Sequence, residues 1–338
     1  MLVVCGWGTV VSSIQGFDHR AMSETNKYST LLIGAGLAML SLASTAVAGD
    51  SPVLTNGVTA MRLPAYLLEV PESVTDILIA NAETSTMHRF VRSGDSVVEK
   101  DRRYMSIGQN GIGKEKSQDK KTPLGVYFIT ERLDTSKLHD KYGVAAFPLD
   151  YPNVWDRHNK RTGHGIWLHG VDQNNPQRPP LDTDGCLSLP NEEILALADD
   201  LEPLVTPVIV ARQIKWATAD ELQSMRLEFR VALDKWRDSL ASGDILTYLS
   251  LYADEFSYRN LNREEWASWR MGVFEANVLD GVEIRDLMLM ADPEVSDLYI
   301  SRFTQILSTK SGPVQTTKRL YWRRSDNNSW KIVSEGTG

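Results

Sequence analysis

The exported form of this chain is expected to keep a single cysteine, and this limits what it can fold into. The 338-residue sequence has two cysteines, and Cys5 lies upstream of an apparent export signal. Cys186 then has no partner for an intramolecular disulfide, and very small exported domains usually depend on such bridges. The protein must therefore be stabilised by hydrophobic cores, so we expect domains of ordinary size, and the length is enough for two.

Residues 1–48 have the layout of a targeting segment. Met22 opens a short polar stretch with one lysine, residues 31–42 are mostly apolar, and Ala-Val-Ala at 46–48 gives a small-residue cleavage pattern. The apolar run is short for a membrane span, which favours a cleaved signal over an uncleaved membrane anchor. We predict a periplasmic protein that starts at Met22, with a lead-in at residues 49–73.

Residues 74–215 are predicted to form a mostly β domain. Two β-type runs, 74–80 and 87–91, flank a turn and predict a hairpin. The further elements expected are a glycine-rich loop at 108–121, strands at 126–129, 165–169 and 207–211, and a helix at 191–198 capped by Asn191.

Residues 218–338 have a different pattern, with helices first and strands after. Thr218 opens a helix whose apolar residues recur every three or four positions, and Gly243 ends it. Strand-like runs fill residues 282–333, so we expect an α+β domain. Its aromatic residues either line a pocket or form the core, and the core is the favoured interpretation: Tyr258, Trp266, Trp269, Tyr299, Trp322 and Trp330.

The net charge of −8 argues against non-specific nucleic-acid binding, because such binding needs a basic surface. Composition is otherwise that of a soluble globular protein. We therefore looked for the function in the surroundings of the unpaired thiol.

Cys186 follows Gly185, and a His-Gly pair, His169-Gly170, lies 17 positions upstream of it. A free thiol is only a few per cent thiolate at pH 7, so a nucleophilic cysteine needs a base such as His169. The Gly170 carbonyl is placed to hold the imidazole N–H and fix the tautomer. Backbone N–H groups of Gly185 and Cys186 are candidates for an oxyanion hole.

Two other interpretations of Cys186 stay open at this point. A lone cysteine is often a small buried hydrophobe. A zinc site with His164 and His169 is disfavoured, because structural zinc sites need four ligands and the usual paired spacings are missing. We expect neither a metal nor another cofactor.

Three segments in order resemble the YkuD-type L,D-transpeptidase catalytic domain. His169-Gly170 and Thr183-Asp184-Gly185-Cys186 are similar to the family's His-Gly and Ser/Thr-x-Gly-Cys motifs, and residues 108–127 resemble its glycine-rich TPxGxY segment. The resemblance covers residues 74–212 and implies a mostly β fold.

The family resemblance also implies chemistry and residue roles. Cys186 would be the nucleophile, His169 the general base and Gly170 the orienting carbonyl, while Thr183 would support the loop and Trp167 lie near the site. Substrates would be peptidoglycan stem peptides, cut between residue three and D-Ala at position four through a thioester. Transfer to an amine gives L,D-transpeptidation, and transfer to water gives L,D-carboxypeptidase trimming.

Two positions depart from the family pattern. Asp184 stands where many members have histidine, and Ser188 where they have arginine or asparagine. The arginine is credited with substrate contacts, so these changes bear on substrate and acceptor binding. A charged Asp184 close to Cys186 would raise the pKa of the thiol, or it would bind an amine of the substrate.

Residues 218–338 resemble an NTF2-like fold, with a cone-shaped sheet. Joined to a YkuD-type domain, this resembles the cell-shape L,D-carboxypeptidases of helical bacteria, which implies a role in wall remodelling. We expect this domain to bind or position, with other cell-wall or envelope proteins as candidate partners. The alternative function for the whole chain is a non-catalytic peptidoglycan-binding or scaffold protein.

Overall fold

The computed structural model describes residues 62–94, 96–259, 261–276 and 279–338. The predicted targeting segment and the first half of the lead-in lie outside these residues. The described end of the lead-in, for which no element was predicted, forms two short strands, β1 (Arg62–Pro64) and β2 (Leu67–Glu69). No helix in the described ranges is long and apolar enough to cross a membrane.

The first part of the chain is built on a five-stranded sheet in the order β5-β4-β3-β12-β7. The strands are β3 (Asp76–Asn81), β4 (Thr86–Ser93), β5 (Ser96–Tyr104), β7 (Gly125–Phe128) and β12 (Pro207–Ala211). The predicted hairpin is confirmed, because β3 and β4 pair antiparallel around the turn that follows Asn81. β3 and β12 are buried along their whole length, as expected of central strands.

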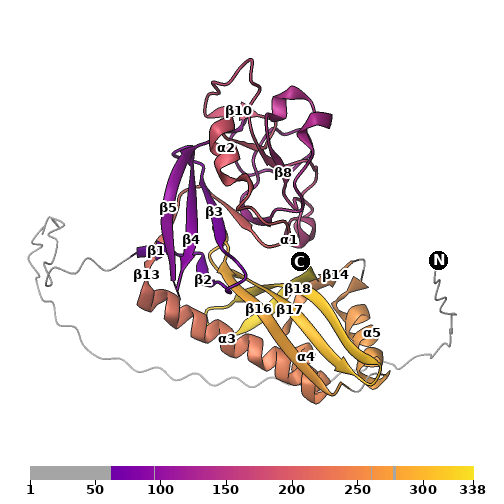
Figure 1. The fold of residues 1–338 in the computed structure, drawn as a ribbon. Helices are drawn as coiled ribbons and strands as arrows, with labels where there is room; N and C mark the ends of the chain where they lie inside the picture. Colours follow the sequence, from indigo (N-terminus) through magenta and orange to yellow (C-terminus); the bar gives the residue numbers. More distant parts are fainter. Residues whose placement is uncertain (1–61, 95, 260, 277–278) are drawn as a thin grey trace, which may run out of the picture. The chain divides into compact units, whose positions relative to one another are not determined.

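Smaller elements carry the cysteine and histidine motifs (Figure 1). They are β6 (Ile107–Gly108), β8 (Ala146–Pro148), β9 (Trp167–His169), β10 (Leu181–Thr183), β11 (Leu187–Ser188), α1 (Val154–His158) and α2 (Asn191–Ala198). β9 lies between β8 and β11 in a three-stranded sheet, and β9 and β11 run parallel. This pairing brings the end of the histidine strand next to the residue after the cysteine.

The sequence predicted Asn191 as the N-cap of α2, and this prediction is wrong. Pro190 holds that position without a side-chain hydrogen bond. The Asn191 side chain is used instead to bridge two loops, accepting a hydrogen bond from Val171 N at 2.9 Å and donating one to Val171 O at 2.8 Å. It thereby fixes the chain directly after the His-Gly pair.

The second part of the chain is α+β, as predicted. Its elements are β13 (Trp216–Thr218), α3 (Ala219–Ser242), α4 (Ile245–Ser250), β14 (Tyr252–Tyr258), β15 (Leu261–Asn262), α5 (Arg263–Ala276), β16 (Gly281–Ala291), β17 (Leu298–Thr309), β18 (Gly312–Arg324) and β19 (Trp330–Thr337). The sheet order is β15-β14-β19-β18-β17-β16-β2, so β2 from the lead-in forms one edge.

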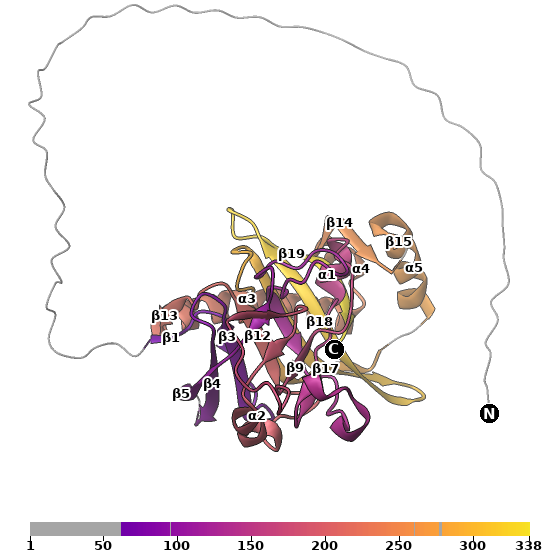
Figure 2. The same ribbon diagram turned by 90° about the horizontal axis from the view of Figure 1, so that it is seen from above.

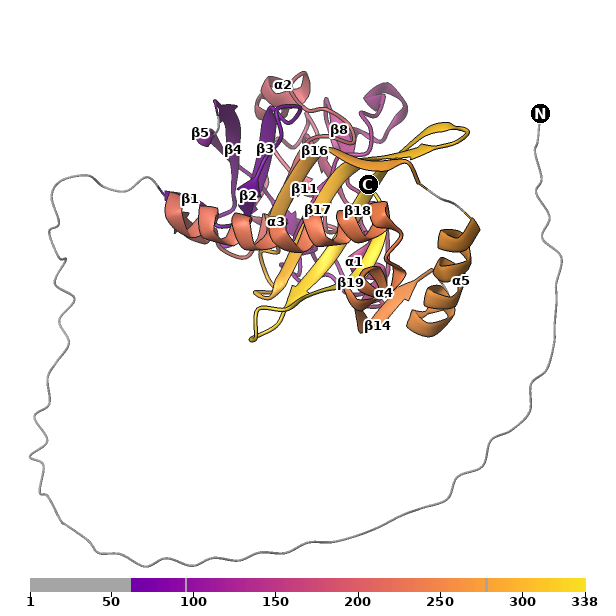
Figure 3. The same ribbon diagram turned by 90° about the horizontal axis from the view of Figure 1, so that it is seen from below.

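The long helix α3 begins and ends where its sequence signals predict. Thr218 and Glu221 form a reciprocal capping box, and Gly243 ends the helix in the left-handed conformation at φ 74°. Figures 1 and 3 show α3 crossing one face of the sheet formed by β16 to β19. Its apolar stripe is buried against that sheet, with Phe229 and Trp236 fully enclosed.

The aromatic residues of the second part are mainly core, as the favoured interpretation predicted. Trp266 and Trp322 are fully buried, and Trp330 stacks on Phe229 at 4.7 Å between ring centroids. Trp269 is the exception, because half of its surface is exposed. It lies on α5, which packs beside α4 and β14 in Figure 2.

One hydrophobic core is shared by the two parts of the chain. It joins Ile77 and Ile209 of the first sheet to Met288 and Leu298 of the second. Buried Arg319 of β18 adds an ion pair to the half-buried Asp150, with 2.6 Å between Nη1 and Oδ2. The first sheet is therefore supported from behind by the second part of the chain.

Candidate active site

Cys186 and His169 line one cleft with a volume of about 740 Å³. Trp167, Thr183 and Asp184 also line it, so the structure brings five of the predicted site residues together. Cys186 is 8% exposed and His169 is 4% exposed. The two side chains thus open into the cleft while most of their surface is packed.

His169 has a fixed ring orientation. Its Nδ1 lies 2.6 Å from the Gly170 carbonyl oxygen, as predicted from the sequence. A carbonyl oxygen can only accept, so the Nδ1 of His169 donates and Nε2 is the nitrogen left to act as a base. A side chain at Gly170 would collide with Asn191, whose Oδ1 lies 2.3 Å from the ideal Cβ position, so only glycine fits there.

The Cys186 sulfur lies beside the chain that leads into β9. The Sγ is 3.4 Å from the Gly165 carbonyl oxygen and also accepts a hydrogen bond from the Trp167 backbone N–H. Trp167 thus contributes its backbone as well as its ring to the site. The parallel pairing of Leu187 with Leu168 places the thiol at this point.

Burial keeps both groups uncharged in the unliganded site. Desolvation lowers the pKa of His169 to about 4, against a smaller raising effect of the Gly170 carbonyl. Desolvation raises the pKa of Cys186 to about 11, and the Trp167 N–H and Lys141 partly oppose this. A neutral thiol therefore lies in the same cleft as a neutral imidazole, the protonation states that general-base activation of a nucleophile requires.

Thr183 supports the cysteine loop in the manner that the family resemblance implies. Its Oγ1 donates to the Cys186 carbonyl at 2.7 Å and accepts the Gly185 N–H at 3.1 Å. The Gly185 N–H is thus already engaged, and its part in an oxyanion hole would require that hydrogen bond to break. Gly185 itself has φ 123° and no room for a side chain beside the Lys121 carbonyl.

The two residues that depart from the family pattern have different surroundings. Asp184 is 66% exposed and lies between two cations, 3.8 Å from Lys120 and 4.0 Å from Lys141. Its negative charge contributes to raising the pKa of Cys186, as predicted. Ser188 is buried, and its hydroxyl donates to the Gly170 carbonyl at 3.0 Å.

Several residues of the cleft were not predicted from the sequence. Lys141 and Tyr142 come from a polar segment that matches no motif, and Tyr142 stacks on Trp167 and places its ring edge-on to His169. Lys120 and Arg178 add two more cations to the wall. The cleft is consequently rich in positive charge, although the chain as a whole is acidic.

The zinc interpretation of Cys186 would need further ligands close to it. Although His164, His169 and Cys186 all line the cleft, no group of three or more His, Cys, Asp or Glu side chains able to hold a metal ion occurs in the described ranges.

Comparison with known families identifies both parts of the chain. Residues 75–210 match the L,D-transpeptidase catalytic domain family, YkuD, and residues 228–336 match the Cds6 C-terminal NTF2-like domain. The protein therefore carries a YkuD L,D-transpeptidase domain followed by an NTF2-like domain, as the sequence predicted. No curated protein matches the sequence.

Solved structures share both domains in this order. The structure of Bd1075 from Bdellovibrio bacteriovorus is 25% identical with a TM-score of 0.68, covering 82% of this chain and 98% of that one. The helical cell shape determining protein Pgp2 from Campylobacter jejuni is 23% identical with a TM-score of 0.67, covering 83% and 96%. At these identities the likeness to Pgp2 concerns the fold.

Proposed function

We propose that this protein is a cysteine enzyme that cuts peptidoglycan stem peptides between residue three and D-Ala at position four. The observation that carries the proposal is the shared cleft of Cys186 and His169, with His169 Nδ1 held by the Gly170 carbonyl at 2.6 Å. The match of residues 75–210 to the L,D-transpeptidase family supports the substrate class.

The reaction follows from the protonation states in the cleft. As the Cys186 sulfur attacks the carbonyl carbon of residue three, His169 Nε2 accepts the thiol proton. The carbon–nitrogen bond to D-Ala breaks, His169 returns the proton to the leaving amine, and a thioester remains on Cys186. Water or an amine then attacks the thioester and gives its proton to His169, which passes it to the leaving sulfur, so that the carbon–sulfur bond breaks and Cys186 is again a thiol.

The positive charge of the cleft fits such a substrate. D-Ala at the end of a tetrapeptide carries a free carboxylate, and Lys120, Lys141 and Arg178 are cations that line the cleft. Lys120 and Lys141 also flank Asp184, and Arg178 pairs with Asp182, so the substrate carboxylate would share these cations. Both acceptors belong to the proposal: transfer to an amine gives L,D-transpeptidation, and transfer to water gives L,D-carboxypeptidase trimming.

The cellular setting is part of the same proposal. The substrate lies outside the cytoplasm, which agrees with the predicted signal segment and a periplasmic location. The NTF2-like domain is proposed to position the enzyme on the wall or on other envelope proteins, and the whole protein to act in wall remodelling and cell shape. The similarity in fold to Pgp2, a helical cell shape determining protein, supports the last point.

The test is incubation with disaccharide tetrapeptide and mass spectrometry of the products. We expect release of D-Ala, or a cross-linked dimer between the third residues, from the native protein. Cys186→Ala should give neither product. Full activity in Cys186→Ala would exclude the cysteine mechanism.

One observation favours a second candidate, a peptidoglycan-binding protein without turnover. Asp184 and Ser188 stand where many members of the family have histidine and arginine or asparagine, and the Ser188 side chain is buried and bound to the Gly170 carbonyl. Such a protein would bind sacculi equally well as native chain and as Cys186→Ala. Absence of any product from tetrapeptide, together with undiminished sacculus binding, would select this candidate.

A further inference from the structure

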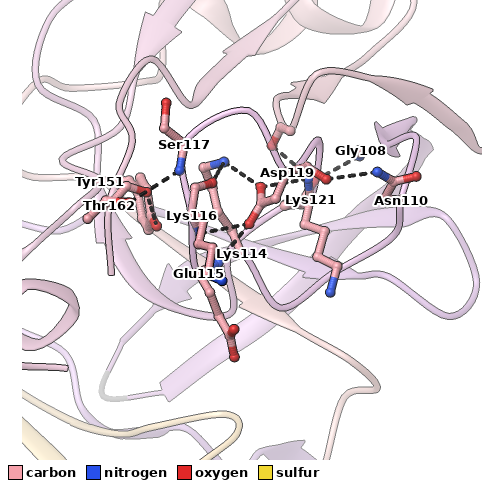
Figure 4. A network of polar contacts seen from close by, with 12 residues as sticks. Gly108, Asn110, Lys114, Glu115, Lys116, Ser117, Asp119, Lys121, Tyr151 and Thr162 are labelled. Carbon is pink, nitrogen blue, oxygen red and sulfur yellow. Dashed lines mark hydrogen bonds and ion pairs between the residues drawn. The ribbon is translucent and has the colours of Figure 1, made fainter. Parts of the chain in front are cut away.

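Asp119 gathers five hydrogen bonds at the edge of the active-site cleft. Its carboxylate accepts from Lys114 Nζ at 2.6 Å and from the backbone N–H groups of Glu115, Lys116 and Lys121 at 2.8, 2.9 and 3.1 Å. Its backbone carbonyl accepts from Asn110 Nδ2 at 2.8 Å. Figure 4 shows these contacts converging on Asp119.

The carboxylate is held in its charged form by these donors. Burial opposes the charge, but the ammonium of Lys114 and the three N–H groups together bring the pKa of Asp119 well below its usual range. Hydrogen bonds to an ionised acceptor are stronger than neutral ones, so Asp119 is a firm anchor for residues 114–121.

The turn around Asp119 is strained on both sides. Gln118 has φ 63° and Lys120 has φ 56°, left-handed conformations that residues with a side chain seldom adopt. Both residues line the active-site cleft. The left-handed conformation turns Gln118 and Lys120 to the cleft and costs free energy. The backbone hydrogen bonds to the Asp119 carboxylate offset that cost.

The same loop touches the residue that precedes the thiol. Thr122 is fully buried, accepts the Gly108 N–H at 2.9 Å and donates its hydroxyl to the Gly185 carbonyl at 2.9 Å. The Lys121 carbonyl lies against the open face of Gly185. Residues 119–122 and the hydrogen bond from Thr122 to the Gly185 carbonyl thus connect Asp119 to the peptide of Cys186.

We propose that Asp119 is a positioning residue of the active site, which holds the 114–122 loop so that Gln118 and Lys120 wall the cleft and Thr122 fixes the Gly185–Cys186 peptide. The part of this proposal that concerns turnover rests on the proposed function. The part that concerns the thiol does not, because it can be measured without any substrate.

The experiment compares Asp119→Asn with the native full chain. An amide keeps the shape but loses the charge and two of its acceptor sites. Steady-state rates with disaccharide tetrapeptide give KM and kcat, and iodoacetamide labelling of the peptide that contains Cys186, followed by mass spectrometry against pH, gives the titration of the thiol. Asp244→Asn is the matched control, because the Asp244 side chain also accepts a backbone N–H, that of Thr247, but does so as the N-cap of α4 and does not line the cleft.

We expect the two readouts to move in opposite directions. A loosened loop should lower kcat/KM about tenfold or more, since small displacements of positioned groups are costly. It should also expose the sulfur, so labelling becomes faster and its pH midpoint falls toward that of a free thiol. Asp244→Asn should change neither readout.

A stabilising role alone gives a different result. If Asp119→Asn lowers the melting temperature while kcat/KM and the labelling midpoint stay at native values, the proposal is wrong. If Asp119→Asn fails to fold, the same two readouts are taken on Thr122→Val, which keeps every contact of Asp119 and removes the hydroxyl that reaches Gly185. Native values of kcat/KM and of the labelling midpoint in Thr122→Val would then contradict the proposal. A native chain without turnover would refute the proposed function, and the labelling midpoint would still decide for or against positioning.

Discussion

His169 should make the protein less stable in acid, and its replacement should remove that effect. The imidazole is 4% exposed, and burial lowers its pKa to about 4, whereas an unfolded chain has a histidine pKa of about 6.5. Between these values the unfolded state binds a proton that the folded state does not. Stability from this group is therefore complete above pH 6.5 and is lost as the pH falls toward 4.

The size of the effect follows from the two pKa values. Between pH 7 and pH 4.5 the linkage relation gives a loss of about 2.5 kcal/mol in the free energy of unfolding for this one group. That is a large fraction of the roughly 5–15 kcal/mol that stabilises an ordinary domain. His169→Gln cannot bind the proton, so its stability should fall less over this range, by about that amount.

The assay is urea unfolding at pH 7 and pH 4.5, followed by tryptophan fluorescence. The measured quantity is the change in unfolding free energy between the two pH values for each protein. His164→Gln is the control, because His164 is exposed in the same cleft. If native chain and His169→Gln lose equal stability on acidification, His169 is not a buried neutral base and the proposed mechanism loses its proton acceptor.

Two further substitutions test the surroundings of the site. Asp184→Asn should speed iodoacetamide labelling of Cys186 at pH 8 by about two- to threefold, because it removes a negative charge that raises the pKa of the thiol. Slower labelling would contradict this electrostatic account. Asp150→Asn should lower the free energy of unfolding, measured in urea, by about 3–5 kcal/mol, because it leaves the buried Arg319 guanidinium without its partner. A loss below about 1 kcal/mol, as small as that of an exposed pair, would contradict this expectation.

Local sequence signals predicted most of the fold. The apolar stripe and the Thr218 and Gly243 signals gave the bounds of α3, and two β-type runs gave the hairpin of β3 and β4, because each depends on residues near in sequence. The same reasoning failed at Asn191, where a typical capping residue instead bridges two loops through contacts about 20 positions away. Short-range patterns do not reveal when a long-range partner competes for a side chain.

The candidate site was predictable where a motif carried it and not elsewhere. His169, Gly170 and Cys186 lie in short recognisable motifs, and the structure brings them to one cleft. Lys141 and Tyr142 line the same cleft from a 3₁₀ helix at Asp140–Tyr142, in a segment whose composition is that of any polar loop. The position of these two side chains in the cleft depends on how the loop folds back on β9, and local sequence patterns do not predict that contact.

The edge position of β2 has a consequence for how this protein is made. β2 precedes the catalytic sheet in the chain but pairs with β16, more than 200 residues later, at Leu67 with Met290. Such distant pairing is slow to form, because a long loop must close before the contact contributes. During synthesis from the N-terminus, β2 must wait without its strand partner until β16 has been translated. A fragment ending after the catalytic domain would keep that unpaired strand permanently, and unpaired strands are sites of aggregation.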